Sequence, residues 1–238
     1  MQNGFITTAL IITISLLSAC SKPPMPEVAA TLAGAITEDD YYSFSAQDGD
    51  KACLIFYPGG LVEPEAYAPL MQQLATAGVH TFLLRPPLNL AIINIDQADA
   101  AKASPLAQQH CQFFVLAGHS LGGVVATMYA ADKPGDALLL IASYFSQEGL
   151  EDYDAPTMIV TAEQDLLSTA QDIEENKVNA PAKVLYRQIA GGNHAQMGYY
   201  GEQDGDGIAT ISRRRQQEML LGFTLELVAL ARASHTTN

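Results

Sequence analysis

The chain has 238 residues, of which 48% are hydrophobic and 16% are charged. This length suits one domain with a sizeable core, and the apolar balance excludes an intrinsically disordered chain. The formal net charge of −14 would repel phosphate backbones, so we expect no nucleic-acid partner. Three cysteines are too few for a disulfide scaffold and lack metal-ligand spacing.

The chain begins with an uncharged, mostly apolar segment, residues 5–19, which Cys20 follows. Its core of about 13 apolar residues is long enough for a signal peptide and short for a bilayer span. Leu17-Ser18-Ala19-Cys20 resembles a bacterial lipobox, which implies removal of residues 1–19 and lipidation of Cys20. Residues 1–4 contain no Lys or Arg, which departs from that pattern, so a plain secretory signal and a buried helix stay open. We expect a membrane-anchored lipoprotein of the bacterial cell envelope, on its periplasmic or outer-membrane side.

The composition changes after the apolar segment. Residues 20–37 contain several prolines and small residues, which is typical of a tether between a lipidated cysteine and a folded domain. Residues 38–238 form one predicted domain without internal repeats, and the sequence does not indicate its oligomeric state.

Six short β-rich runs follow one another along this domain, and several are continuously apolar. Such runs are typical of strands buried on both faces of a parallel sheet. The predicted strands are Cys53–Tyr57, Val79–Leu84, Phe113–Ala117, Ala137–Ile141, Thr157–Thr161 and Lys183–Ile189.

Helical stretches alternate with these strands. They are predicted from Pro69 to Gly78, from Leu121 to Asp132, from Thr169 to Asn176 with Ser168 as the cap, and from Arg213 to Arg232. The alternation predicts an α/β fold with a doubly wound, mostly parallel sheet and helices on both faces. Because the segment from Ile141 to Thr157 is short, no cap domain is expected over the site.

A candidate nucleophile lies in Gly118-His119-Ser120-Leu121-Gly122, a G-x-S-x-G motif. The motif follows a predicted strand and opens a predicted helix, which is the context that a nucleophile elbow requires. A strained turn of this kind exposes the serine hydroxyl, and the helix N-terminus favours developing negative charge. A glycine-rich turn with an idle serine is the alternative.

A serine hydroxyl needs a neighbouring base to become a nucleophile. Of the five histidines, His194 lies in the loop after the last predicted strand, where a base can reach the elbow. His80 and His110 are expected to be structural, His119 to pack under the elbow, and His235 to lie in the frayed C-terminal tail. We therefore predict His194 as the base, with a loop-stabilising role as the alternative.

A carboxylate should orient that imidazole and stabilise its cation. Asp165 follows the strand Thr157–Thr161, and Glu163 is its rival in the same turn. We favour Asp165, although both acids could simply cap the loop. The resulting chain order of Ser120, Asp165 and His194 is the one expected for α/β-hydrolases.

Stabilising an oxyanion requires two backbone N–H groups. One is expected from Leu121, directly after the nucleophile. The other is expected from Gly60, in the Pro58-Gly59-Gly60-Leu61 loop, where glycine lets the backbone approach a substrate closely. Leu61 is the neighbouring candidate, and a tight turn without function is the alternative.

Several motifs in the same order resemble the α/β-hydrolase superfamily, and within it the small lidless fold-5 group related to dienelactone hydrolases. The likeness covers about residues 38–232. It rests on Tyr57–Gly60, Glu65–Leu70, Pro87–Ala91, Gly118–Gly123, Gly191–Gly201 and Gly205–Gly207. It implies a serine hydrolase, generally of carboxylic esters, with Ser120, Asp165 and His194 as the triad, and it names no particular substrate.

Other residues carry weaker expectations. Asn89 and Tyr199 lie in loops beside the site and either contact the substrate or only hold their loops. Cys53 and Cys111 precede strands that are neighbours in the usual hydrolase sheet, so they form either a disulfide or two buried thiols. Asp204 and Asp206 lie among glycines, and we expect turn chemistry rather than a calcium loop.

The sequence therefore predicts a membrane-tethered serine esterase that acts on a small-molecule ester through an acyl-enzyme. This mechanism requires neither a metal nor an organic cofactor, and we expect none. A thioesterase, amidase or dienelactone-type hydrolase could use the same triad. A non-catalytic lipoprotein that binds a ligand on the same fold is the alternative from another class.

Overall fold

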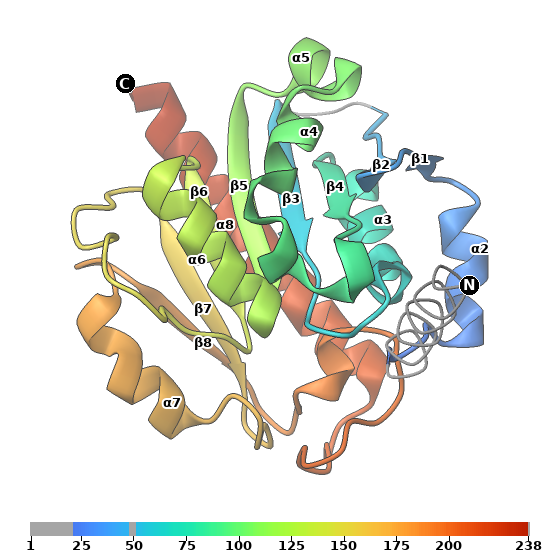
Figure 1. The fold of residues 1–238 in the computed structure, drawn as a ribbon, viewed down its shortest axis with the longest axis vertical. Coiled ribbons are helices and arrows are strands. Elements are labelled where there is room, and N and C mark those ends of the chain that lie inside the picture. The colour runs from blue at the N-terminus through green and yellow to red at the C-terminus, as the bar shows by residue number, and fades with distance from the viewer. Residues whose placement is uncertain (1–20, 48–50, 238) are drawn as a thin grey trace, which may run out of the picture.

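One sheet carries the three predicted catalytic residues at the ends of its strands. The computed structural model describes residues 21–47 and 51–237, and within them eight strands form a sheet in the order β1-β2-β4-β3-β5-β6-β7-β8 (Figure 1). The strands are β1 (Ile36–Thr37), β2 (Tyr41–Phe44), β3 (Ala52–Tyr57), β4 (His80–Leu84), β5 (Phe113–His119), β6 (Ala137–Ile141), β7 (Thr157–Ala162) and β8 (Leu185–Ile189). β2 runs antiparallel to β1 and β4, and the other neighbouring pairs are parallel.

This arrangement confirms the predicted α/β fold. The six predicted strands are present, with ends shifted by at most two residues. All residues of β3, β4 and β6 are buried, as expected for strands covered on both faces. The antiparallel strands β1 and β2 were not predicted, because they are short and the four residues of β2 are too few for a clear pattern.

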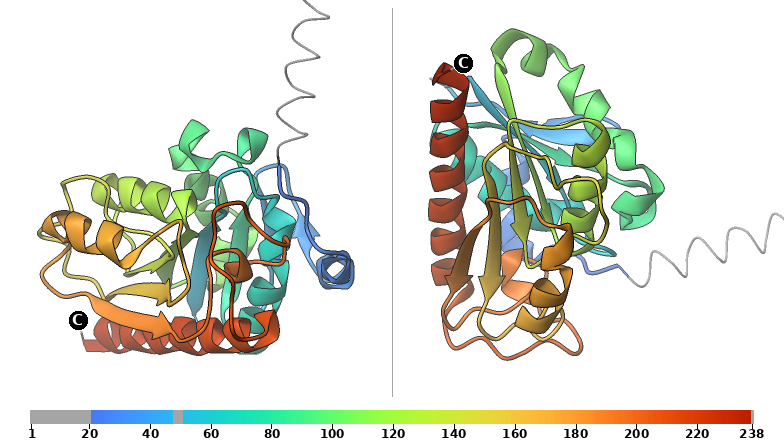
Figure 2. Two further views of the ribbon diagram at one scale, coloured as in Figure 1. Left: turned by 90° about the horizontal axis from the view of Figure 1, so that it is seen from below. Right: turned by 90° about the vertical axis from the view of Figure 1, so that its left-hand side faces the viewer.

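Helices cover both faces of the sheet. The longer ones are α3 (Ala68–Thr76), α6 (Leu121–Asp132) and α8 (Arg213–Thr237), and the shorter ones are α2 (Ala29–Leu32), α4 (Ala98–Lys102), α5 (Pro105–His110) and α7 (Ala170–Glu175). α3 and α8 cover one face, and α4, α6 and α7 cover the other (Figures 1 and 2). Single 3₁₀ turns occur at Pro26–Val28, Pro64–Tyr67, Pro87–Asn89, Ala91–Ile93, Ile95–Gln97, Asn176–Asn179 and Ala195–Met197.

Several helix ends differ from the prediction, and α3 spans Ala68–Thr76 rather than Pro69 to Gly78. The cap of α7 is Thr169 rather than Ser168, because the Thr169 hydroxyl accepts a hydrogen bond from the Asp172 N–H while the Asp172 carboxylate accepts one from the Thr169 N–H. α8 continues past Arg232 to Thr237.

The N-terminal segment also differs from the expected tether. Cys20 and the predicted signal, residues 1–19, lie outside the described residues. Within residues 21–37 the chain forms short helical turns and β1, and the buried Val28 belongs to the core beneath α3 and α8. This part of the chain is therefore folded against the domain.

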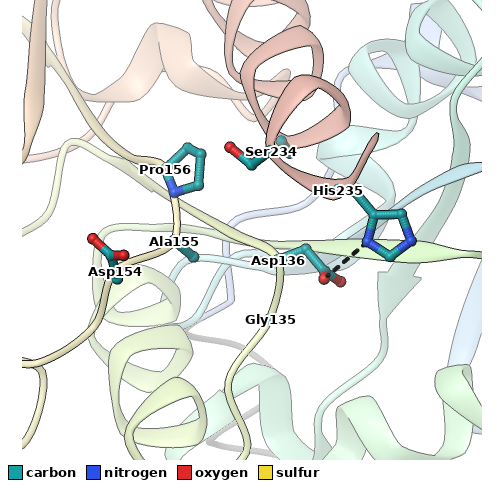
Figure 3. Close-up of a pocket in the computed structure, with 8 residues that line it drawn as sticks. Gly135, Asp136, Asp154, Ala155, Pro156, Ser234 and His235 are labelled. Carbon is teal, nitrogen blue, oxygen red and sulfur yellow. Dashed lines mark ion pairs between the residues drawn. The ribbon is translucent and has the colours of Figure 1, made fainter. Parts of the chain in front are cut away.

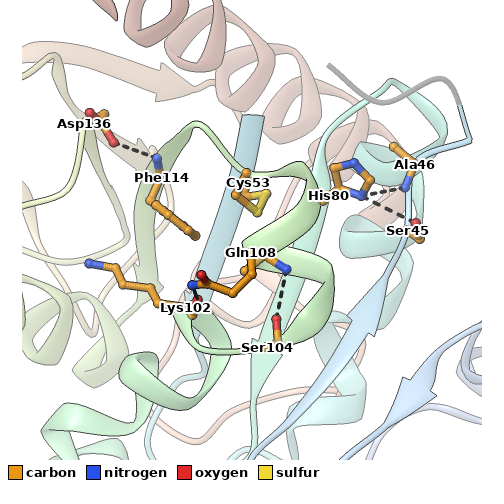
Figure 4. The surroundings of a disulfide bond; sticks show 11 residues. Ser45, Ala46, Cys53, His80, Lys102, Ser104, Gln108, Phe114 and Asp136 are labelled. Atoms are coloured by element: carbon orange, nitrogen blue, oxygen red, sulfur yellow. Dashed lines mark hydrogen bonds between the residues drawn. A yellow bond between two sulfur atoms is a disulfide. The ribbon is translucent and has the colours of Figure 1, made fainter. Parts of the chain in front are cut away.

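A disulfide joins Cys53 to Cys111, with 5.5 Å between their Cα atoms. It connects the start of β3 to the turn between α5 and β5, two strands that are neighbours in the sheet (Figure 4). Of the two alternatives that the sequence left open, the structure has the disulfide. It lies at the amino ends of the strands, away from the site described next.

Candidate active site

The three predicted catalytic side chains lie at one edge of the sheet. Ser120 follows β5, Asp165 follows β7 and His194 follows β8, and these parallel strands end at the same edge. The left view of Figure 2 looks onto this edge. Ligands of open α/β sheets bind at the carboxyl ends of the strands, so the topology allows these residues to act together.

Ser120 occupies a strained turn between β5 and α6. Its backbone has φ 52° and ψ −125°, a conformation that costs a non-glycine residue on the order of 1–3 kcal/mol. Two hydrogen bonds help to hold the turn: the Ser120 N–H donates to the Ile141 carbonyl at 2.9 Å, and the Ser143 hydroxyl donates to the Ser120 carbonyl at 2.8 Å. A Cβ atom at Gly122 would lie 2.2 Å from the Tyr57 carbonyl oxygen, so the motif needs glycine there.

Asp165 and His194 form a buried pair. The His194 Nδ1 lies 2.9 Å from the Asp165 Oδ2, and both side chains are at most 2% exposed. The other carboxylate oxygen of Asp165 accepts hydrogen bonds from the Leu167 and Ser168 N–H groups, at 2.9 and 2.8 Å. These bonds fix the carboxylate, which in turn orients the imidazole and leaves its Nε2 as the remaining basic nitrogen.

Glu163, the rival acid, has another partner. Its carboxylate accepts a hydrogen bond from the Gly191 N–H at 2.7 Å, which ties the turn after β7 to the loop after β8. Asp165 is therefore the acid that contacts the candidate base.

Ser120 lies at the same edge of the sheet as the Asp165–His194 pair, but its hydroxyl makes no hydrogen bond to His194, the candidate base. Its hydroxyl forms no hydrogen bond to any residue within the described ranges. The residue before Ser120 contacts the candidate base, because the ring centroids of His119 and His194 lie 4.5 Å apart. Catalytic hydrogen bonds in free enzymes are often long and close only when substrate binds.

His119 packs under the elbow, as predicted. The Tyr67 hydroxyl lies 2.8 Å from the His119 Nδ1 and accepts a hydrogen bond from the Gly59 N–H at 3.2 Å. The Tyr67 hydroxyl and the His119 Nδ1 share a hydrogen bond, whose donor depends on the tautomer of His119. Burial, together with the neighbouring His194, holds the pKa of His119 well below its ordinary value.

The two candidate oxyanion donors are adjacent. A Cβ atom at Gly60 would lie 2.9 Å from the Leu121 Cδ2, so glycine allows the loop after β3 to approach the start of α6. Neither the Gly60 nor the Leu121 N–H donates a hydrogen bond to another described residue. The Leu61 N–H, by contrast, donates to the Asn89 carbonyl at 2.8 Å, which removes Leu61 as a donor.

Asn89 and Tyr199, the two weaker candidates for substrate contact, instead form hydrogen bonds that stabilise neighbouring loops. The Asn89 side chain donates to the Ser21 hydroxyl at 2.9 Å, while its carbonyl holds Leu61. The Tyr199 carbonyl accepts a hydrogen bond from the Met25 N–H at 2.7 Å, and its half-buried ring lies under Arg213. For both residues, the structure favours the loop-holding alternative.

Three further residues shape the loop that carries His194, and the sequence reasoning did not assign them to the site. The Asp206 carboxylate accepts hydrogen bonds from the His194 and Ala195 N–H groups, at 3.3 and 2.8 Å. The Gln216 side chain bonds both the N–H and the carbonyl of Asn193. Arg213 donates to the carbonyls of the same loop, which are those of Ala195, Gly198 and Gly201.

The sequence gives a signal for the role of Asp206 but none for that of Arg213. Asp206 stands between two glycines in a motif that the family resemblance included, so its turn-holding role was within reach. Arg213 opens an Arg-Arg-Arg run in which nothing distinguishes it from its exposed neighbours.

A separate pocket of about 550 Å³ lies at the opposite edge of the sheet (Figure 3). Residues that precede β6 and β7, including Asp136 and Pro156, form one side of it, and the last turns of α8 form the other. His235 lies 3.8 Å from Asp136 there. None of the candidate catalytic residues lines this pocket.

Comparisons with known proteins agree with this architecture. The family model described as the alpha/beta hydrolase family matches residues 53–218. A search of curated proteins found no match.

Similar solved structures include an alpha-beta serine hydrolase homologue from Coxiella burnetii, with 15% identity, a TM-score of 0.58, and coverage of 79% of this chain and 94% of that one. Est1E from Butyrivibrio proteoclasticus, described with ferulic acid bound, has 15% identity, a TM-score of 0.55, and coverage of 82% and 99%. The thermophilic esterase Est2 from Thermogutta terrifontis has 16% identity, a TM-score of 0.55, and coverage of 85% and 96%.

At these identities the structures share the fold, while the family match extends over most of the chain, from the start of β3 into α8. The chain belongs to the alpha/beta hydrolase family.

Proposed function

We propose that this protein is a serine hydrolase of carboxylic esters. The observation that carries the proposal is the buried Asp165–His194 hydrogen bond of 2.9 Å beside the strained Ser120 turn. The arrangement supplies a nucleophile, a base and an acid in the chain order typical of this fold. One of the similar structures is described as an esterase, which supports the choice of ester chemistry.

The proposed reaction begins when the Ser120 Oγ attacks the acyl carbon and transfers its proton to the His194 Nε2. Asp165 stabilises the resulting imidazolium, and the Gly60 and Leu121 N–H groups bind the oxyanion. The ester C–O bond then breaks, and the imidazolium protonates the departing alkoxide. A water molecule, deprotonated by His194, attacks the acyl-enzyme and releases the carboxylic acid, which regenerates Ser120.

We also propose that the protein is held at a bacterial membrane by acyl chains on Cys20. The lipobox-like residues 17–20 support this anchor. Among the helices of residues 21–47 and 51–237, none is long and apolar enough to cross a bilayer.

Pre-steady-state hydrolysis of p-nitrophenyl esters of increasing acyl length tests the ester chemistry. We expect a burst of p-nitrophenol from the wild type, because acylation by an activated ester is faster than water attack on the acyl-enzyme, and no burst from Ser120→Ala or His194→Gln. Hydrolysis at the wild-type rate by Ser120→Ala would reject the proposal. A matched control is Ser234→Ala, an exposed serine at the opposite edge.

A further inference from the structure

The N-terminal strap, residues 21–25, is built into the rim of the candidate active site. The Lys22 N–H donates to the Leu61 carbonyl at 2.7 Å, and the Glu63 N–H donates to the Lys22 carbonyl at 3.0 Å. The Met25 N–H bonds Tyr199, in the loop that follows the base. The strap thus connects the loop that carries Gly60 to the loop that carries His194.

The position of Ser21, the first residue of the strap, determines which edge of the molecule acyl chains on Cys20 would bring to the membrane. The Ser21 hydroxyl accepts the Asn89 hydrogen bond of 2.9 Å, so Ser21 lies at the loop that follows β4. Cys20 itself is outside the described residues but is joined to Ser21 by one peptide bond, which spans about 3.8 Å between Cα atoms. Acyl chains on Cys20 would therefore enter the bilayer beside the active-site edge.

The same edge displays exposed aliphatic side chains. Among the described residues, ten large hydrophobic side chains are exposed, and six of them lie in the loops after β4, β7 and β8. We call these six the apolar rim: Leu88, Ile92, Ile93, Leu166, Leu167 and Ile208. Leu166 is 63% exposed directly after Asp165, and Ile208 is 88% exposed.

The apolar rim and the strap together favour a lipid bilayer as the partner of this surface. Exposed aliphatic clusters in soluble domains mark binding surfaces, and a bilayer can bury them at a gain of about 25 cal/mol per Å². The net charge of −14 opposes an anionic surface, so apolar contact and the anchor must provide the attraction, and a neutral lipid surface suits the protein best.

We propose that the apolar rim rests on the lipid bilayer, so that the site takes acyl esters held in the membrane. This inference rests on the proposed ester hydrolysis and on acylation of Cys20, and it adds the orientation of the site and the substrate class. The ester bond of such a lipid lies at the interface, at the depth that a site facing the bilayer can reach.

Tryptophan fluorescence tests the orientation without requiring catalysis, because the chain contains no tryptophan. Full-length Leu166→Trp is isolated from bacterial membranes and reconstituted into vesicles of brominated phosphatidylcholine. The control is Val178→Trp, because Val178 is 81% exposed and follows α7 at the far edge. We expect bromine to quench the emission at position 166 but not at position 178. Equal emission loss at both positions, or an unmodified Cys20 in the mass spectrum, would overturn the inference.

Kinetics test the substrate class. Leu166→Ser/Ile208→Ser is compared with the control Val178→Ser/Leu230→Ser, which also removes two exposed aliphatic side chains. For the rim variant, we expect the rate on a vesicle-embedded acyl ester to fall about tenfold relative to the rate on a soluble short-chain ester, because about two aliphatic contacts with the bilayer are lost. An unchanged ratio would reject membrane-held substrates while leaving ester hydrolysis intact. Loss of activity toward both esters in the wild type would instead reject the proposed function.

Discussion

Tyr67 connects two parts of the site through one hydroxyl. It accepts the Gly59 N–H and shares a hydrogen bond with the His119 Nδ1, so it positions the loop that carries Gly60 against the residue that precedes Ser120. Tyr67 itself has no proposed contact with substrate and is a positioning residue. Its effect on catalysis should pass through the placement of the Gly60 N–H.

Tyr67→Phe should therefore lower kcat about tenfold while leaving KM nearly unchanged, since an oxyanion donor acts mainly in the transition state. The control is Tyr153→Phe, which removes a hydroxyl that donates to the Gly135 carbonyl at 2.9 Å, far from the site. Steady-state kinetics and thermal unfolding of both variants separate the effects. Equal kcat losses in the two variants, in step with their losses of stability, would contradict the positioning role.

His119 should make the stability of the fold depend on pH. Burial lowers its folded-state pKa well below the ordinary value of 6.5, so in acid the unfolded state binds a proton that the folded state does not. The free energy of unfolding therefore falls as the pH drops below about 6.5, with a slope of about 1.4 kcal/mol per pH unit for one proton. The pKa of His80 is also lowered by burial and adds a change of the same sign.

Urea unfolding at several pH values between about 4.5 and 7.5 measures this slope. His119→Gln should reduce it, because glutamine does not titrate. A slope in His119→Gln equal to that of the wild type would show that His119 does not carry the effect.

At the scale of elements, the loop between β8 and α8 owes its shape to side chains from its own far end. Asp206 accepts N–H groups on both sides of the His194 peptide unit, while Arg213 and Gln216 hold the carbonyls of the loop from the first turn of α8. The candidate base His194 is thus placed by a folded loop rather than by a strand.

Asp206→Asn should lower kcat by about tenfold, because the two N–H groups bond different carboxylate oxygens and an amide has only one, so a hydrogen bond is lost and the imidazole loses part of its orientation. Asp204→Asn, two residues away and exposed, is the matched control and should keep wild-type kinetics. If the two variants have equal kcat values, Asp206 does not position the base.

Elements with strong apolar patterns were predicted most accurately. Ala137–Ile141 and Leu121–Asp132 have the predicted ends, since one is a continuous apolar run and the other lies between the elbow and Pro134. The short antiparallel strands β1 and β2 and the folding of residues 21–37 depend on distant partners, such as Leu84 for Tyr41 and Tyr199 for Met25. Such pairings leave no local signal.

In the candidate site, too, residues with a local sequence signal were predicted and residues that depend on distant partners were not. The motif around Ser120, the turn at Asp165 and the loop at His194 were identified from local context, and the structure pairs Asp165 with His194. Tyr67 and Arg213 were not identified as site residues, because their roles depend on hydrogen bonds to the Gly59 N–H and to loop carbonyls distant in sequence. Only the folded chain brings these groups together.

At the scale of the whole molecule, the sheet separates two ends with different roles. The disulfide lies at the amino ends of β3 and β5. The pocket of Figure 3 lies at the same end of the sheet, between the residues that precede β6 and β7 and the last turns of α8. The carboxyl ends carry the candidate catalytic residues, the N-terminal strap and the apolar rim. Catalysis and membrane contact are thus proposed for one end, and covalent stabilisation lies at the other.

Labelling with a fluorophosphonate, followed by intact-mass measurement and peptide mapping, tests the central claim most directly. A fluorophosphonate reacts with a serine only when a neighbouring base activates its hydroxyl. We predict one phosphonyl group on Ser120 in the wild type, much slower labelling of Asp165→Asn, and none of Ser120→Ala. Equal labelling of the wild type and Ser120→Ala, or an adduct at another residue, would contradict the account.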